Sequence, residues 1–190
     1  MEEKELIIKA KEGSIMAFND LLYLYENRVF GYCMKVLGNR PDALDATQET
    51  FIKFWKNLDS VNEVLPLKSW IFKIATNTCF DILRKRKNTP ILFTELEKTD
   101  DEGNIATFDP PDTYQLPSRL FKRIDIENAI SKVRDKYRVP IVLFYVEDMT
   151  YENIAETLNI PLNTVKSLIF RGRKMLVDEL EKNGENRSEN

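Results

Sequence analysis

The sequence TYENIAETLNIPLNTVKSLIFRGRK, at residues 150–174, combines two helical patterns with one tight turn. Thr150 can cap a helix, because its hydroxyl can accept a hydrogen bond from a free backbone N–H at the helix start. Apolar residues then recur at helical spacing as far as Leu158. Asn159 tolerates the left-handed conformation that a tight turn requires, and Pro161 suits the start of the next helix because its missing N–H would be unpaired there. The stretch therefore predicts a short helix, a turn and a longer helix.

The longer helix of this stretch is predicted to have one apolar face and one polar face. The inner positions are apolar or small: Val165, Ile169, Gly172 and Leu176. The outer positions are polar, and four of them are basic: Asn163, Thr164, Lys166, Ser167, Arg171, Arg173 and Lys174. This pattern is typical of a helix-turn-helix whose second helix enters the major groove of DNA. The local pattern alone leaves open an ordinary helical hairpin with a solvated basic face.

The composition of the whole chain limits what such a motif can do. The chain has 190 residues, a formal net charge of −3 and no histidine. Any contact with DNA must therefore come from local basic patches and be sensitive to salt, and histidine-based metal sites are excluded. Cys33 and Cys79 stand in apolar helical contexts, which favours small buried residues over a disulfide or a metal pair. No stretch is long and apolar enough to span a membrane, so we expect a soluble, cytoplasmic protein without membrane insertion.

The first part of the chain is predicted to form helices that build a core. Residues 3–11 predict a short helix that Gly13 ends, and Ser14 can cap the next one. A long amphipathic helix follows, and Gly38 and Asn39 stop it. Its apolar positions step by three or four residues: Phe18, Leu22, Tyr25, Val29, Cys33 and Val36.

Residues 42–58, DALDATQETFIKFWKNL, predict a helix with two different faces. The buried stripe is predicted at Ala43, Thr47, Thr50, Phe51, Phe54 and Leu58. The opposite face is predicted to hold Asp45, Gln48, Glu49, Ile52 and Lys56, with Trp55 at its edge. Polar residues around a few large apolar side chains indicate a protein-docking face. A solvated surface with two scattered apolar residues fits the spacing equally well.

Residues 67–87, LKSWIFKIATNTCFDILRKRK, predict a strongly basic helix. Its inner stripe is predicted at Ile71, Ile74, Ala75, Thr78 and Ile82. The opposite face gathers Lys73, Thr76, Asn77, Phe80, Arg84 and Lys87, with Trp70 beside it. Basic side chains among exposed aromatic rings suit single-stranded DNA, because cations bind phosphates and rings stack on bases. The basic run at the helix end could instead only complement the helix dipole, but the two aromatic residues favour DNA.

The remaining residues predict a linker and a second helical domain. Residues 91–121 are rich in acidic residues and prolines, which indicates a flexible linker. Residues 122–183 predict one helix up to Val133, another from Pro140 to Val146 with the proline in its first turn, and the two helices described first. Residues 184–190 are polar and predicted to fray. The fold class is therefore all-α, with residues 1–90 and the four-helix unit 122–183 as two domains.

Three segments, in this order, resemble motifs of the extracytoplasmic-function (ECF) sigma factors, in the sigma-70 family of bacterial RNA polymerase sigma factors. DALDATQETFIKFW resembles the segment with which that family docks on the polymerase. SWIFKIATNTCFDILRKRK resembles the helix that handles the −10 promoter element. KYRVPIVLFYVEDMTYENIAETLNIPLNTVKSLIFRGRKML resembles the unit that reads the −35 element. The resemblance covers nearly the whole chain.

This resemblance implies a transcription initiation factor that has no cofactor and no catalysis of its own. Its implied partners are core RNA polymerase, promoter DNA and an anti-sigma factor, which can be membrane-bound. Polymerase binding is implied for Asp45, Gln48, Glu49, Ile52 and Trp55. Binding of the −10 element is implied for Trp70, Lys73, Asn77, Phe80, Arg84 and Lys87, with the loop of residues 59–67 as a pocket for a flipped base. The outer residues of the last helix are implied to bind the −35 element.

The sequence also departs from the family pattern. The family usually has glycine where Asp148 stands, arginine where Leu168 stands and alanine at Gly172. Because the family's arginine contacts DNA, Leu168 puts one −35 contact in question. Leu44 and Ala46 replace the common glutamate and leucine in the docking helix, where they can alter how the helix packs.

Two other functions compete with transcription initiation. A stand-alone helix-turn-helix regulator usually dimerises to read two half-sites. It would not need a domain with both a docking face and a basic DNA face, as predicted for residues 1–90. A nucleic-acid-processing enzyme would need a cluster of acidic residues at metal spacing, a histidine or a phosphate loop, and the sequence contains none of these.

Overall fold

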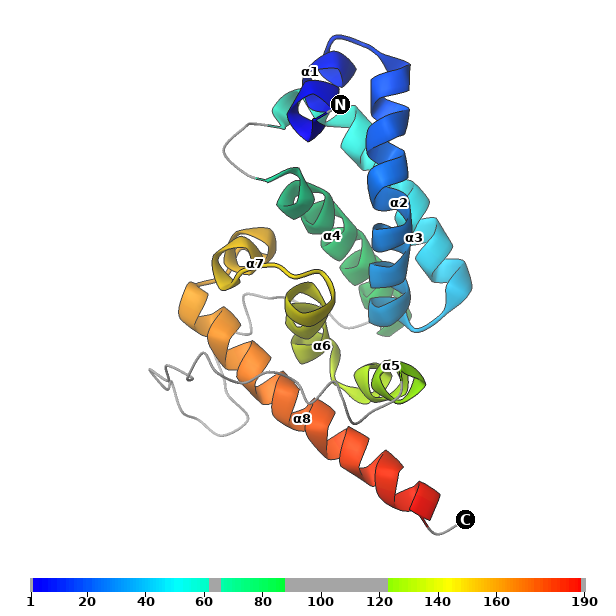
Figure 1. Ribbon diagram of the computed structural model, residues 1–190, viewed down its shortest axis with the longest axis vertical. Coiled ribbons are helices and arrows are strands. Elements are labelled where there is room, and N and C mark those ends of the chain that lie inside the picture. Colours follow the sequence, from blue (N-terminus) through cyan, green and yellow to red (C-terminus); the bar gives the residue numbers. More distant parts are fainter. Residues whose placement is uncertain (1, 62–65, 88–122, 189–190) are drawn as a thin grey trace. The chain divides into compact units, whose positions relative to one another are not determined.

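The computed structural model describes residues 2–61, 66–87 and 123–188. Every regular element in these residues is helical, which confirms the all-α fold class. The chain divides into two compact units, Met1–Pro90 and Ile91–Asn190. Figure 1 shows the helices of both units, coloured from the N-terminus in blue to the C-terminus in red. The predicted linker at residues 91–121 lies outside the described residues.

The first unit contains four α-helices and one short 3₁₀ turn among its described residues. They are α1 (Glu3–Lys11), α2 (Ile15–Leu37), α3 (Arg40–Lys56), η1 (Leu58–Ser60) and α4 (Leu67–Lys87). The long helix α2 contacts α1, α3 and α4, and α3 also contacts α4. Helices α2, α3 and α4 therefore form a three-helix core, with α1 against one end of α2 (Figure 1).

The predicted ends of α2 are confirmed, whereas α3 begins and ends two residues earlier than the predicted range 42–58. The Ser14 hydroxyl accepts a hydrogen bond of 3.3 Å from the Ala17 N–H at the start of α2. Gly38 ends α2 with a φ of 74°, a left-handed conformation that glycine adopts without steric cost. Asn39 then caps α3 by accepting a bond of 2.9 Å from the Asp42 N–H. These capping residues set where α2 ends and where α2 and α3 begin.

The core between α2 and α4 holds two polar contacts. Tyr32 and Thr76 are buried, and their hydroxyls share a hydrogen bond of 2.6 Å. Cys33 and Cys79 are free and fully buried, with 3.6 Å between their Sγ atoms. The contact with Cys33, and then burial, raise the pKa of the Cys79 thiol well above its ordinary value. The prediction of small buried residues is therefore confirmed.

The second unit is a four-helix arrangement around α8. Its elements are α5 (Arg123–Lys132), α6 (Asp135–Ile141), the π-helical segment η3 (Val142–Val146), α7 (Tyr151–Leu158) and α8 (Leu162–Ser188). Helix α8 contacts α5, α6 and α7. It continues to Ser188, five residues beyond the predicted end of the domain at position 183.

The prediction for Pro140 is wrong. The helix begins at Asp135, so the proline lies inside α6 rather than in a first turn. Apolar periodicity missed this start because the opening residues of α6 are polar. Arg138 holds the start in place: its Nη2 donates to the carbonyl oxygens of Ser131 and Val133, both at 2.7 Å. Proline removes one N–H from the helical ladder, and the wider turns of η3 follow directly after it.

Helix α8 approaches α6 closely at Gly172. A Cβ atom added there would lie 2.5 Å from Cδ1 of Ile141 and 3.0 Å from Cβ of Tyr137. The missing side chain therefore sets the distance between the two helices. The family's usual alanine would require Ile141 to move.

Candidate docking and DNA-binding surfaces

The outer face of α3 is exposed, as its spacing predicts. Its exposed residues are Asp45, Gln48, Glu49, Ile52 and Trp55. Two large apolar side chains stand out among them, because Ile52 is 54% and Trp55 43% exposed. The six residues predicted on the inner stripe, from Ala43 to Leu58, are all buried. The α3 face therefore presents an apolar pair surrounded by polar groups.

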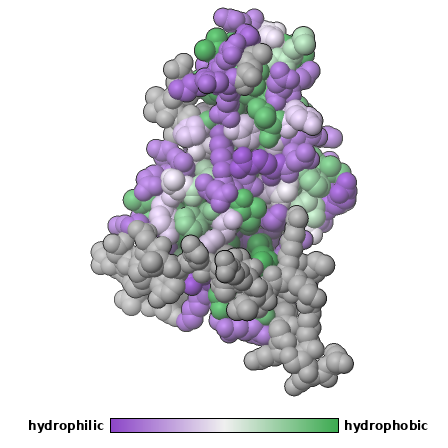
Figure 2. Space-filling model, in the orientation of Figure 1, coloured by the Kyte–Doolittle hydropathy of each residue, from purple (hydrophilic) through white to green (hydrophobic). Residues whose placement is uncertain are grey.

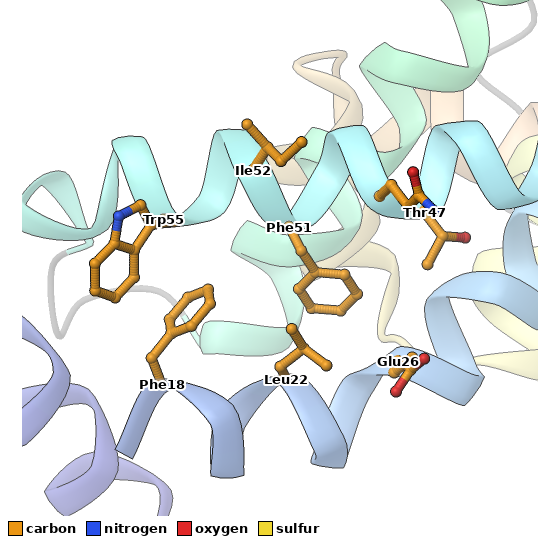
Figure 3. A pocket seen from close by; sticks show the side chains of 8 residues that line it. Phe18, Leu22, Glu26, Thr47, Phe51, Ile52 and Trp55 are labelled. Carbon is orange, nitrogen blue, oxygen red and sulfur yellow. The ribbon is translucent and has the colours of Figure 1, made fainter. Parts of the chain in front are cut away.

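An apolar groove between α2 and α3 adjoins this face. It has a volume of about 490 Å³ and is lined by Phe18, Leu22, Glu26, Thr47, Gln48, Phe51, Ile52 and Trp55. Figure 3 shows Phe18 and Leu22 on α2 opposite Phe51 on α3. The Trp55 ring meets the Phe18 ring edge to face at 4.6 Å, and so closes one end of the groove. Phe18 is buried, as predicted, and Leu22 is half-buried, but the pattern of α2 alone did not show that both also line a groove.

Further apolar side chains are exposed on the helices of the first unit. They are Ile8 on α1, Ile15, Met16, Tyr23 and Leu24 on α2, and Leu44 on α3. On the molecular face shown in Figure 2, hydrophobic residues of the described chain are interspersed with hydrophilic ones. Single exposed apolar side chains of this kind are common on protein surfaces, and none of them lines the groove.

The exposed residues of α4 make a narrower basic surface than predicted. Lys73, Asn77 and Arg84 are exposed, and Trp70 is half-buried. The Trp70 ring lies 6.3 Å from the Phe54 ring of α3, so one side of it rests on the core. The side chain of Lys87 lies outside the described residues. This surface offers cations, one amide and part of an indole to a ligand.

The predicted exposure of Phe80 and Thr76 is wrong. Phe80 is only 4% and Thr76 only 2% exposed. Helix α4 contacts both α2 and α3, and therefore buries most of its circumference rather than one stripe. Ile74 and Ile82, which were predicted to be inward, are only half-buried. Phe80 is a core residue and has no ring face to offer to a DNA base.

Part of the basic run at the end of α4 is also structural. The Arg86 guanidinium pairs with the Asp42 carboxylate and donates a hydrogen bond of 3.0 Å to the Leu37 carbonyl oxygen. It thereby ties α4 to the junction of α2 and α3.

The helix-turn-helix of the second unit has the predicted geometry. Thr150 accepts a hydrogen bond of 3.2 Å from the Asn153 N–H at the start of α7. Asn159 ends α7 in the left-handed conformation, with a φ of 54°. Asp148, where the family usually has glycine, also has a positive φ of 48°. These two residues set the turns on either side of α7.

The seven residues of α8 predicted to bind DNA all lie outside its buried stripe. Asn163 and Lys174 are exposed, and the others are half-buried: Thr164, Lys166, Ser167, Arg171 and Arg173. The predicted inner positions, Val165, Ile169, Gly172 and Leu176, are all buried. The separation of the two faces along α8 is therefore confirmed.

Two further apolar residues of α8, Leu168 and Phe170, lie on opposite sides of the helix. Leu168 is 7% exposed and belongs to the buried side, so position 168 offers no side chain to DNA. Phe170 is 36% exposed, and helical spacing places it on the outer face with Ser167 and Lys174. Phe170 was not among the residues predicted to bind DNA, although its spacing from Ser167 and Lys174 places it on their face. An apolar side chain on such a face can contact the methyl group of thymine.

Other kinds of site are not found among the described residues. No group of three or more metal-binding side chains occurs there. In the same part of the chain, every helix is too short or too polar to cross a membrane.

Comparison with known proteins matches both units. Residues 21–89 match the family model "Sigma-70 region 2", and residues 123–176 match "Sigma-70, region 4". The chain is 34% identical to the ECF RNA polymerase sigma factor SigW of Bacillus subtilis over 181 residues, 93% of this chain and 96% of the relative. It is 30% identical to the ECF RNA polymerase sigma-E factor of Haemophilus influenzae over 185 residues, 95% of this chain and 96% of the relative.

Solved structures with a similar fold include a sigma factor bound to another protein. It is the sigma factor RpoE in complex with the anti-sigma factor NepR from Bartonella quintana. The TM-score is 0.65 at 24% sequence identity, and the match covers 88% of this chain and 98% of the other.

Proposed function

The chain belongs to the ECF sigma factors of the sigma-70 family, and from this premise we propose how its surfaces share the work of transcription initiation. It is a transcription initiation factor whose partners are core RNA polymerase and promoter DNA. A stand-alone regulator is not favoured, because region 2 and region 4 both match. Its relatives regulate transcription without catalysis, and we infer the same of this chain.

The α3 face, Asp45 to Trp55, docks on the polymerase. The observation that carries this proposal is the exposed pair Ile52 and Trp55 beside the apolar groove. Such a pair can bury its area against a partner helix, while Gln48 and Glu49 at the rim make polar contacts. The groove adds Phe18 and Leu22 of α2 to the same interface.

The basic surface of α4 binds the −10 element. Lys73 and Arg84 hold phosphates, Asn77 reads a base edge, and Trp70 offers the edge of its ring. Lys87, three residues after Arg84 in the sequence, is proposed as a further cation for phosphates. Phe80 is left out because it is buried. Of the loop at residues 59–67, proposed as a base pocket, residues 62–65 lie outside the described part.

The outer face of α8 binds the −35 element as duplex. A helix fits the major groove without opening the base pairs. Asn163, Thr164, Ser167 and the four basic residues of α8 are all at least partly exposed, and Phe170 adds an apolar contact.

An anti-sigma factor completes the set of partners. The similar sigma factor from Bartonella quintana is bound to one, and we extend this type of partner to the present chain. Since its polymerase and DNA partners are cytoplasmic, we infer a cytoplasmic protein.

The function is tested by transcription with purified core polymerase on a pool of promoter fragments. We expect transcripts whose start sites share one −10 and one −35 sequence, and no such transcripts from core polymerase alone. Transcripts that are the same with and without the chain would contradict the proposal.

The role of α8 gives a salt-dependence prediction. If its four basic residues bind phosphates, the slope of log affinity against log salt is about −3 to −4 for −35 duplex. Replacing Lys166 with glutamine removes one such contact and is expected to flatten the slope by about 0.9. Fluorescence anisotropy of labelled duplex at several salt concentrations measures this. Lys182→Gln is the matched control, because Lys182 lies on the same helix beyond the outer face and pairs with Glu179. An unchanged slope for Lys166→Gln would remove Lys166 from the DNA contacts.

A further inference from the structure

Lys53 connects the docking helix with the DNA-binding helix of the first unit. Its ammonium lies 2.8 Å from Oε1 of Glu49, one turn earlier on α3. The same group donates a hydrogen bond of 3.2 Å to the hydroxyl of Thr78 on α4. Thr78 is fully buried, so this contact anchors the lysine against α4. Lys53 also lies 4.0 Å from Oδ2 of Asp81, one turn further along α4.

Asp81 is shared between Lys53 and a second cation. Its other oxygen, Oδ1, lies 3.2 Å from Nη1 of Arg84. Asp81 is also the only acidic residue between Lys68 and Lys87. Glu49, Lys53, Asp81 and Arg84 therefore form a chain of alternating charges from the α3 face to the basic surface of α4.

The carboxylates of Glu49 and Asp81 compete for the ammonium of Lys53. The guanidinium of Arg84 can pair either with Asp81 or with a DNA phosphate. A carboxylate beside Arg84 competes with a DNA phosphate for the guanidinium. The more closely Lys53 approaches Asp81, the more it neutralises that carboxylate, and the weaker the hold of Asp81 on Arg84 becomes. The distances to Glu49 and Asp81 show that, in the free protein, Lys53 lies nearer the docking-face carboxylate.

We propose that this charge chain couples polymerase docking to DNA binding, with Lys53 and Asp81 as positioning residues. A cation of the polymerase that binds Glu49 releases Lys53 toward Asp81, and Asp81 then releases Arg84 to a phosphate. The inference rests on the proposed function of the α3 and α4 surfaces. All four side chains are partly exposed, so the coupling is small, about two- to fourfold in affinity.

The test is a double-mutant cycle in the holoenzyme, on a promoter recovered by the transcription assay. The single-stranded −10 region of its non-template strand is the labelled probe. Lys53→Met is expected to weaken binding about two- to fourfold and to flatten the salt slope, because Asp81 then keeps Arg84 from a phosphate. Asp81→Asn is expected to tighten binding. In the Asp81→Asn background, Lys53→Met is expected to have no effect, since no carboxylate remains to be neutralised.

An equal loss from Lys53→Met in both backgrounds would overturn the proposal, because Lys53 would then contact DNA or polymerase directly. No loss in either background would overturn it as well. Lys53→Arg keeps the positive charge and is expected to bind the probe with an affinity close to that of the wild type. Lys9→Met is the matched control, since it breaks another exposed pair four residues apart, Lys9–Glu5 at 2.9 Å on α1.

One further variant separates this coupling from the proposed function. Arg84→Gln is expected to weaken DNA binding. In the Arg84→Gln background, Lys53→Met is expected to cause no further loss of affinity. If Arg84→Gln binds like wild type, the assignment of Arg84 to DNA is wrong, and the coupling is overturned with it. If Arg84→Gln weakens binding but the cycle shows no interaction, the DNA surface stands and only the coupling is overturned.

Discussion

Replacing Ile52 with aspartate is expected to weaken polymerase binding strongly and leave the fold intact. The side chain is 54% exposed in the free protein, so the substitution removes little from the core. In the complex, the aspartate would be buried without a partner, at a cost of about 3 kcal/mol or more, which is at least about a hundredfold in affinity. Titration of labelled protein with core polymerase measures the loss, and thermal unfolding should be unchanged.

Ile8→Asp is the control for this substitution. Ile8 is 50% exposed, but it lies on α1, outside the α3 face and the groove. It receives the same change in chemistry and should bind polymerase with wild-type affinity. If Ile52→Asp binds as tightly as Ile8→Asp, the α3 face is not the docking surface.

Local signals account for what the sequence predicted well. The ends of α2 and α7 follow from Ser14, Gly38, Thr150 and Asn159, each of which acts within a few residues of its own position. The faces of α3 and α8 follow from a single apolar stripe, because each presents one broad side to solvent. In these elements, local propensity and burial agree.

The errors arise where burial depends on more than one neighbour. A helix that packs between two others has no single inner stripe, so the periodicity of α4 did not show that Phe80 faces inward. The α2–α3 groove combines residues of two helices, and neither helix alone indicates a cavity. Phe170 was not predicted on the outer face of α8, because the prediction for that face counted only polar and basic residues.

Comparison of Leu168 with the family pattern shows a further limit of sequence reasoning. The substitution for arginine raised the question of a lost DNA contact. Leu168 is buried with the apolar side of α8, so the position contributes to packing in this chain.

Phe80→Ala is expected to act through stability rather than through DNA. Removing a buried phenylalanine costs about 3–5 kcal/mol, a large part of the roughly 5–15 kcal/mol that stabilises a domain. We therefore expect a lower unfolding temperature for the first unit. Transcription should be lost equally on a duplex promoter and on a template whose −10 region is already unpaired, because both require a folded first unit.

Two variants make this prediction decisive. Phe80→Leu keeps most of the apolar volume, and should recover most of the stability and the activity on both templates. Asn77→Ala removes an exposed side chain of the same helix and should unfold like wild type while binding the −10 strand more weakly. If Phe80→Ala unfolded at the wild-type temperature and lost activity only on the duplex promoter, its ring would have to act on unpaired bases. Burial of the ring at 4% exposure argues for the opposite outcome, in which stability and activity fall together.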